Sequence, residues 1–206
     1  MQNFDRLLHV FRSPKFRSVV EDAIKFFAQT PLHPLPPTTA FVGAGVYALY
    51  YIGNFELYAK MATLNSLENC NFPIYVGKAV PPSWRTGRVG LSTTPDLYRR
   101  LREHARSLRQ VNNLQEDEFM CRFMILNDLE SDLVGSVEAS LIRQHRPLWN
   151  MVVDGFGNHD PGSGRYNQAK SEWDILHPGR TWAERLTGVS PALENIVIKV
   201  QRYFEN

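Results

Sequence analysis

Two short runs of apolar and aromatic residues, 45–53 and 73–78, constrain the fold of this chain more than any other stretch. Each run is bounded by glycine or proline, and this pattern is typical of a buried β-strand. Each also carries a tyrosine close to a glycine, Tyr47 in the first run and Tyr75 in the second. Because glycine lets a ligand or another backbone approach closely, we expect the two strands to pair and the two tyrosines to meet at a functional site.

The first run contains a second tyrosine–glycine pattern, at residues 51–53, which is not the partner of the first. Residues 48–50 contain nothing that can turn the chain, so Tyr47 and Tyr51 must project from the same face of one strand. The partner strand therefore follows residues 54–72, where the spacing predicts a short amphipathic helix inserted in the connection. Connections of this length tend to carry function.

The composition fits one globular unit rather than two full domains, since the 206 residues are 43% hydrophobic and 21% charged. No run reaches the ~18 consecutive apolar residues of a membrane span, and no signal peptide opens the sequence. Two cysteines without zinc-ligand spacing predict no disulfide framework and a cytoplasmic location.

The net charge of +2 conceals two segments of opposite charge. Residues 75–113 contain eight lysines and arginines and two acids, whereas residues 114–140 contain seven acids and one arginine. A basic segment beside an acidic one suits a protein that binds phosphates with the first and a cation with the second. The alternative is that both segments are solvated helix faces.

The remaining sequence predicts one further strand and several helices. Residues 118–126 form an apolar run that suits a central strand. Apolar spacing and capping residues predict helices at residues 4–29, 96–108, 131–146, 180–186 and 191–204. The proline-rich segment 31–37 is expected to be an extended linker with His33 as a loop residue, and residues 147–154 are expected to be extended.

Polar side chains occupy informative positions on two of these helices. Arg100 and His104 are four residues apart, so they lie together on one edge of an apolar helix face. Glu138, on the next helix, falls inside the apolar arc. A carboxylate there either forms a buried salt bridge or binds a metal, because burying it alone costs several kcal/mol. Asn150 either ties the end of that helix to the site or simply caps the helix.

Two loops carry residues suited to nucleic-acid contact. The loop at residues 79–94 interleaves Trp84 with basic residues, although it could also be a solvated lid. The glycine-rich segment 155–165 has polar tips that can follow DNA closely and read bases. The candidate DNA-contacting residues are Arg85, Arg88, Arg102, Arg106, Asn158, His159 and Arg165.

Five motifs resemble those of the GIY-YIG nucleases and occur in the same order. They are Gly45-Val46-Tyr47, Tyr75-Val76-Gly77-Lys78, Arg100 with His104, Glu138, and Asn150. Together they form a specific pattern over residues 45–154, whereas each motif alone would be weak. The chain departs from the family pattern by a valine in place of isoleucine in both tripeptides and by a long spacer of 27 residues between the two tyrosines. The resemblance implies an α+β fold, in which a small three-stranded antiparallel sheet is flanked by helices.

The flanking segments are similar to the small type II restriction endonucleases that cut CCGCGG. The similar parts are the proline-rich approach, the enlarged hairpin and residues 150–165. This resemblance implies hydrolysis of double-stranded DNA at a short GC-rich palindrome by a homodimer, or a higher oligomer on DNA. It also implies a cognate DNA methyltransferase as partner. The alternatives are a structure-selective GIY-YIG repair or homing nuclease and a catalytically silent DNA-binding module.

The resemblance assigns the chemistry of the site to a metal ion and a general base. Glu138 would be the only protein ligand of one divalent cation, Mg²⁺, with Mn²⁺ as a substitute. Tyr47 would be the general base toward the attacking water, and His104 would accept or relay the proton. A tyrosine has a pKa of ≈10, so it needs neighbours that stabilise its phenolate or take its proton.

The resemblance assigns supporting roles to four other residues. Tyr75 would position water or phosphate through its hydroxyl. Arg100 would hold the scissile phosphate through charge-assisted hydrogen bonds. Lys78 would lower the pKa of the base, and Asn150 would support the geometry from the helix end.

We expect the chain to consist of three segments within one compact unit. Residues 1–43 are a helical extension with the proline-rich linker. Residues 44–154 are the nuclease core with its insertion at 54–72. Residues 155–206 are the glycine-rich loop and C-terminal helices.

Overall fold

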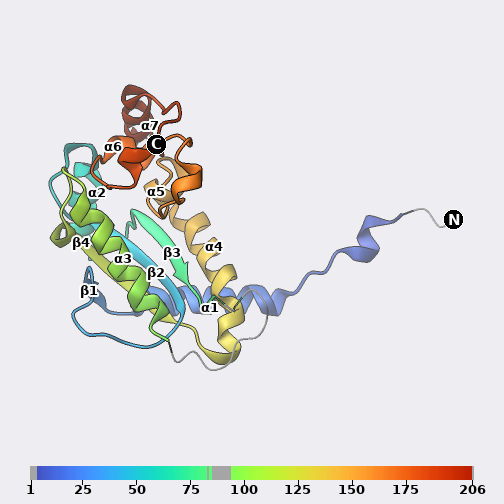
Figure 1. Cartoon of the computed structure of the whole chain (residues 1–206). Helices are drawn as coiled ribbons and strands as arrows, with labels where there is room; N and C mark the ends of the chain where they lie inside the picture. The colour runs from blue at the N-terminus through green and yellow to red at the C-terminus, as the bar shows by residue number, and fades with distance from the viewer. Residues whose placement is uncertain (1–3, 83, 85–93, 206) are drawn as a thin grey trace.

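In the computed structural model, which describes residues 4–82, 84 and 94–205, one antiparallel sheet lies at the centre of the molecule (Figure 1). Its strands, in the order β1-β4-β2-β3, are β1 (Leu32–Pro34), β4 (Phe119–Ile125), β2 (Gly45–Tyr51) and β3 (Tyr75–Ala79). The predicted pairing of the two tyrosine strands is confirmed, since Tyr47 of β2 lies opposite Gly77 of β3. On its other edge β2 pairs with β4, and every residue of this central strand is buried.

The helices are α1 (Pro14–Gln29), α2 (Ala59–Leu67), α3 (Asp96–Gln110), α4 (Val134–His145), α5 (Leu148–Met151), α6 (Glu172–Leu176) and α7 (Leu193–Glu205), with 3₁₀ turns η1 (Arg6–His9), η2 (Glu56–Tyr58), η4 (Glu116–Glu118), η5 (Asp128–Leu133), η6 (Ser163–Arg165) and η7 (Ala183–Arg185). Local chemistry sets several of their ends. The Ser13 hydroxyl accepts a hydrogen bond from the Phe16 amide at 3.1 Å and caps α1, whose first residue is proline. Helix α4 ends at His145, and the residue after it, Arg146, has a left-handed φ of 47° and is followed by proline.

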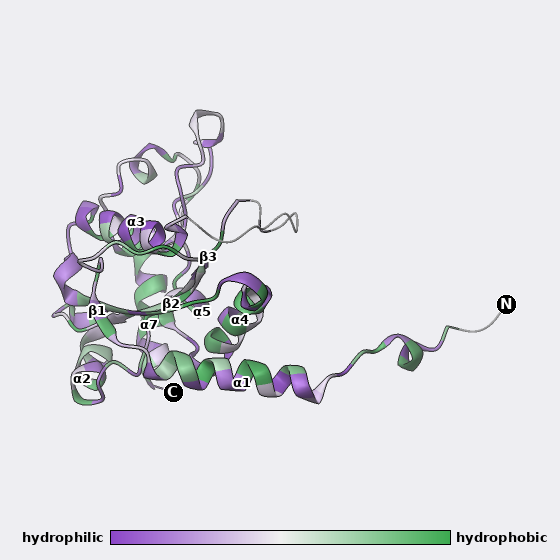
Figure 2. Cartoon of the chain, turned by 90° about the horizontal axis from the view of Figure 1, so that it is seen from below, coloured by the Kyte–Doolittle hydropathy of each residue, from purple (hydrophilic) through white to green (hydrophobic). Residues whose placement is uncertain are grey.

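The two faces of the sheet bury different side chains of β2. Tyr47, Leu49 and Tyr51 belong to one apolar cluster, together with residues of α2, α3 and the C-terminal helices. The alternate residues Val46, Ala48 and Tyr50 belong to a second cluster with residues of α1 and α4 (Figure 2). Tyr47 and Tyr51 therefore share a face, as the absence of a turn between them predicted.

The α+β class is confirmed, but the sheet has four strands where three were expected. The additional strand β1 comes from the proline-rich segment, for which only an extended linker was predicted. Its His33 lies opposite Cys121 of β4. Proline is tolerated there because β1 is a three-residue edge strand, where the missing amide interrupts no ladder on its outer side.

Outside the sheet, three predictions need correction and one helix was missed. Residues 147–154 are not all extended, since Pro147 leads directly into the short helix α5. The helix expected at 180–186 is only the turn η7, and α6 was missed because it spans five residues. In the insertion, α2 is present, but its buried face includes Asn65 while Leu67 is 77% exposed.

Asn65 is buried because its side-chain amide closes the insertion onto the end of β2. Its Nδ2 donates to the carbonyl oxygens of Tyr51 and Phe72, and its Oδ1 accepts from the Phe72 amide. A buried polar side chain with all these partners costs little.

Residues 4–13 extend away from the rest of the molecule (Figures 1 and 2). Four large apolar side chains on this arm are between 78% and 88% exposed, namely Phe4, Leu7, Leu8 and Phe11. Within the described ranges, no helix has the length and apolar character that a membrane crossing requires.

Candidate active site

The glycines of the two tyrosine motifs make room for the site. A Cβ atom on Gly77 would lie 2.4 Å from the hydroxyl oxygen of Tyr47, so only glycine at this position leaves the Tyr47 ring where it is. A Cβ atom on Gly45 would lie 2.0 Å from the carbonyl oxygen of Met124 on the neighbouring strand. The Tyr47 and Tyr75 rings lie with centroids 6.2 Å apart on the face that α3 covers. The predicted meeting of the two tyrosines is therefore found.

The Tyr47 hydroxyl forms a hydrogen bond with His104 of α3, with 2.6 Å between the oxygen and Nε2. Tyr47 is fully buried and His104 is 2% exposed. Burial lowers the pKa of His104 well below its usual value, and the positive charges of Arg100 and Arg180 lower it further. The imidazole is therefore neutral at ordinary pH, and with its proton on Nδ1 its Nε2 accepts the hydrogen bond from the Tyr47 hydroxyl.

Burial raises the pKa of Tyr47 well above its usual value. The Tyr75 and Glu138 groups add to this effect, while the positive charge of Arg100 opposes it. Tyr47 is therefore a neutral phenol at rest, and it can act as a base only if His104 takes its proton as it accepts another.

Arg100 lies beside this pair and is held by three groups. Its Nη1 donates to the Glu103 carboxylate at 3.1 Å and to Nε2 of His159 at 2.7 Å. Its Nη2 donates to the Gly157 carbonyl oxygen at 3.0 Å. A partly buried guanidinium held in this way presents a fixed positive charge beside Tyr47 and Tyr75.

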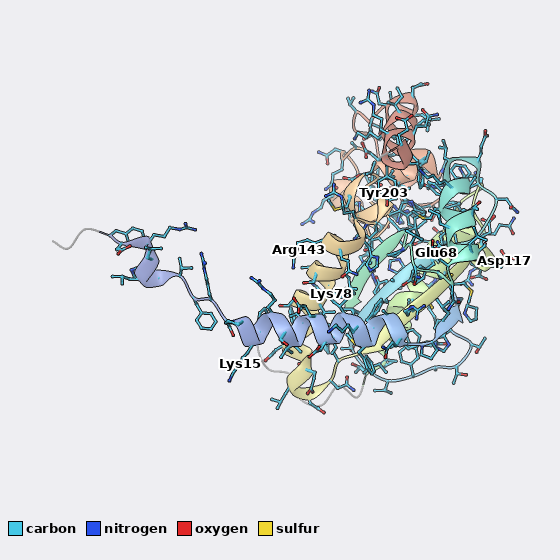
Figure 3. All side chains as sticks on the ribbon, turned by 180° about the vertical axis from the view of Figure 1, so that it is seen from behind. Lys15, Glu68, Lys78, Asp117, Arg143 and Tyr203 are labelled. Atoms are coloured by element: carbon cyan, nitrogen blue, oxygen red, sulfur yellow. The ribbon has the colours of Figure 1, made fainter. Side chains whose placement is uncertain are left out.

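Glu138 and Lys78 meet across the space between α4 and β3. The Lys78 ammonium lies 2.6 Å from Oε2 of Glu138, and the two side chains are 36% and 19% exposed. Figure 3 labels Lys78, on the strand next to α4. The salt bridge that the sequence allowed for Glu138 is therefore present. Lys78, which was expected to lower the pKa of the base, pairs instead with this carboxylate.

The donor set around Glu138 fits a magnesium ion held by one protein ligand. Oε1 of Glu138 has no hydrogen bond within the described part of the chain, and the carboxylate is partly open to solvent. No group of three or more potential ligand residues occurs among the described residues. Mg²⁺ is commonly bound through one or two carboxylates and keeps several waters, so this single carboxylate is a chemically suitable ligand, whereas a Zn²⁺ site would need more protein ligands.

Asn150 contacts the backbone of β3 rather than the reactive side chains. Its Oδ1 accepts from the Val76 amide at 2.8 Å, and its Nδ2 donates to the Val76 carbonyl oxygen at 2.9 Å. Because β3 is the edge strand, these two bonds satisfy backbone groups that no further strand covers. Asn150 therefore ties α5 to the backbone of β3, and its supporting role in the reaction stays a prediction.

The DNA-contacting candidates that the structure describes lie on two segments of the chain. Arg102 and Arg106 are exposed on α3, where they line a shallow hollow of about 360 Å³. Asn158, His159 and Arg165 lie on the exposed C-terminal loop, and of these only His159 contacts the site, through Arg100. The remaining candidates, Arg85 and Arg88, lie outside the described residues.

Sequence reasoning missed three residues near the site. Phe156 stacks on the His104 ring, with centroids 4.5 Å apart, and Gly157 contacts Arg100. Arg180 is fully buried beneath this loop. The aromatic residue between two glycines was a signal that the loop packs against something, but nothing near Arg180 in the sequence indicated its partners.

The arrangement can transfer a proton and hold an anion. The hydrogen bond between Tyr47 and His104 is a path for a proton, and Arg100 supplies a fixed positive charge for a phosphate. Glu138 adds a carboxylate suited to a divalent cation. These are the groups that phosphoryl-transfer chemistry requires.

One family model matches the chain, and its description is the Eco29kI GIY-YIG domain. The match covers residues 39–204, which is most of the 206 residues and includes every residue of the site described above. No match to the chain is found among the curated proteins.

Proposed function

We propose that the chain, which belongs to the Eco29kI GIY-YIG domain family, is a type II restriction endonuclease. It hydrolyses phosphodiester bonds of double-stranded DNA at a short GC-rich palindrome, CCGCGG. The observation that carries the proposal is the buried 2.6 Å hydrogen bond between Tyr47 and His104, with Arg100 beside it. A silent DNA-binding module would have no use for a neutral imidazole aligned to take a proton from a phenol.

Each residue of the site has its own role in the proposed reaction. Water attacks the phosphorus atom as its proton passes to the Tyr47 oxygen, and the Tyr47 proton passes to Nε2 of His104. The 3′ oxygen leaves and takes a proton from solvent. Tyr75 orients the water or a phosphate oxygen through its hydroxyl, and Arg100 stabilises the charge that develops on the phosphate.

Glu138 would hold Mg²⁺, or Mn²⁺ in its place, by its partly open carboxylate. When bound there, the cation would stabilise negative charge on the phosphate and on the leaving oxygen. Lys78 orients the carboxylate through its ion pair and adds positive charge beside the phosphate. Asn150 keeps β3, and with it Tyr75 and Lys78, in place.

A palindromic target matches a homodimer, in which each subunit cuts one strand. The exposed apolar residues of the arm 4–13 support this assembly, because a second copy would bury them. Association into a higher oligomer on DNA is compatible with the same surface. The enzyme acts in the cytoplasm, and a cognate DNA methyltransferase protects the host sites.

Digestion of plasmid DNA in Mg²⁺, followed by sequencing of the ends, tests this function. Defined ends within CCGCGG are expected. Ends at branches or lesions would instead indicate a repair or homing nuclease, and no cleavage would indicate a silent DNA-binding module.

A further inference from the structure

We propose that Arg180 is a positioning residue for the nuclease reaction, because it holds the loop 155–159 against two catalytic side chains, Arg100 and His104. The inference rests on the proposed function and extends it to the C-terminal segment. That segment was expected only to contact DNA. In this account it completes the active site.

Arg180 is buried and directs its guanidinium at the loop backbone. Its Nη1 donates to the carbonyl oxygens of Phe156 at 3.0 Å and Asn158 at 3.4 Å, and its Nη2 donates to that of Gly155 at 3.0 Å. Three carbonyl oxygens within four consecutive residues are therefore fixed by one side chain. Only a planar fork of donors can make these bonds together, so lysine is not an equivalent residue.

The Arg180 guanidinium is itself held on the remaining sides. Its Nε donates to Oδ1 of Asp174 at 2.7 Å, and the side chains of both residues are at most 1% exposed. The Ser171 hydroxyl donates to the other carboxylate oxygen of Asp174 at 2.6 Å. The rings of Trp173 and Trp182 lie 4.5 and 4.7 Å from the guanidinium carbon. Such a site leaves the guanidinium one orientation.

The loop that Arg180 fixes contacts the catalytic side chains at three points. Phe156 stacks on His104 with an angle of 16° between the rings. The Gly157 carbonyl oxygen accepts from Nη2 of Arg100, and the His159 ring nitrogen contacts Nη1. The contacts of Arg180 and the contacts to the site are interleaved along the same five residues. A shift of the loop would therefore move both Arg100 and His104.

This arrangement is more specific than core packing requires. A buried ion pair contributes little net stability compared with apolar residues of the same volume, so stability alone does not explain Arg180. The donors of Arg180 instead define the path of a backbone that contributes a carbonyl oxygen to the site. We infer that the geometry of Arg100 depends on this path.

Replacement of Arg180 by lysine tests the inference directly, with Arg185→Lys as the matched control. Arg185 lies on the same segment, but it is exposed and pairs with Asp160 at 2.8 Å. We expect Arg180→Lys to slow single-turnover cleavage in Mg²⁺ by about tenfold to a hundredfold, because small misplacements of catalytic groups have effects of this size. DNA affinity and the fraction of folded protein should stay within about twofold of wild type, whereas the Arg185→Lys enzyme should cleave normally.

A second variant covers the case in which Arg180→Lys fails to fold. A Cβ atom on Gly157 would lie 2.8 Å from the Tyr75 hydroxyl and 3.4 Å from Nη2 of Arg100. Gly157→Ala should therefore slow cleavage without disturbing the buried arginine. Gly164→Ala is its control, since among the described residues no atom beyond its two chain neighbours lies within 4 Å of the added carbon.

Hydrogen exchange of the amides at 155–159 separates failure of this inference from failure of the proposed function. Faster exchange in Arg180→Lys together with slower cleavage supports the positioning role. Faster exchange with wild-type cleavage, or unchanged exchange, overturns it. A wild-type protein that cuts no DNA refutes the proposed function, and a positioning role in that reaction falls with it, even if the exchange shows that Arg180 holds the loop.

Discussion

Removal of one oxygen atom, by Tyr47→Phe, should separate catalysis from binding. The hydroxyl lies 2.6 Å from Nε2 of His104, and both residues are buried. Its loss leaves a buried nitrogen without this partner, which costs about 1–3 kcal/mol of unfolding free energy. For a chain of this size the melting temperature should fall by about 2–12 °C. Cleavage should fall by about 10²–10⁴-fold, the contribution of a general base.

The control for this variant is Tyr51→Phe, on the same strand and the same face. The Tyr51 hydroxyl is also buried and accepts the Phe55 amide at 2.6 Å, so its loss should cost similar stability. It makes no contact with the site residues and should leave cleavage unchanged. The assay is single-turnover cleavage well below either melting temperature, with DNA affinity measured in parallel. A Tyr47→Phe enzyme that cuts within about fivefold of wild type would refute the proton path.

Three further predictions concern pH, the sheet edge and the DNA surface. Burial, reinforced by the charge of Arg180, lowers the pKa of His177 to about 3. Because His177 binds a proton more weakly in the folded protein than in the unfolded chain, the free energy of unfolding should be greatest above pH 6.5 and should fall by up to about 5 kcal/mol toward pH 3. Urea unfolding at several pH values should show a smaller loss for His177→Gln than for wild type. Asn150→Asp keeps the acceptor for the Val76 amide but loses the donor to the Val76 carbonyl oxygen, so the free energy of unfolding should fall by about 1–3 kcal/mol. An unchanged free energy of unfolding would contradict the role of Asn150 in holding the edge strand β3. Arg102→Gln should reduce the slope of log Kd against log salt by about 1. Arg109 pairs with Glu116 at 2.6 Å, so the control Arg109→Gln should leave the slope unchanged. Equal slopes for both variants would exclude a phosphate contact by Arg102.

The features that the sequence predicted are those that depend on local pattern. The central strand was clear because residues 45–51 are buried on both faces and read as a continuous apolar run. Helix spacing placed Arg100 and His104 on one edge, where the structure finds both beside Tyr47. These inferences need only the neighbours of each residue along the chain.

The features that were missed depend on partners far apart in the sequence. Strand β1 exists because β4 offers a free edge to a segment that is otherwise read as a linker. The insertion helix buries Asn65 instead of Leu67 because the Asn65 amide donates to the Tyr51 carbonyl oxygen at the end of β2. Arg180 reaches a loop more than 20 residues earlier in the chain. No local pattern encodes such contacts.

Glu138 shows where the sequence left two readings that the structure reconciles. The apolar arc allowed either a salt bridge or a metal ligand. Oε2 of Glu138 forms the salt bridge with Lys78. The carboxylate is also partly open to solvent, so it can still bind a metal ion.

Cleavage of supercoiled plasmid by Glu138→Ala in Mg²⁺ tests most directly whether the site is a metal-assisted phosphodiesterase. Glu130→Ala, which removes an exposed acid from η5, serves as the control. The account predicts that Glu138→Ala binds DNA at least as tightly as wild type, because a negative charge is removed, and cuts none of it. Plasmid cleavage that survives the loss of Glu138, at the rate of the Glu130→Ala control, would contradict the account.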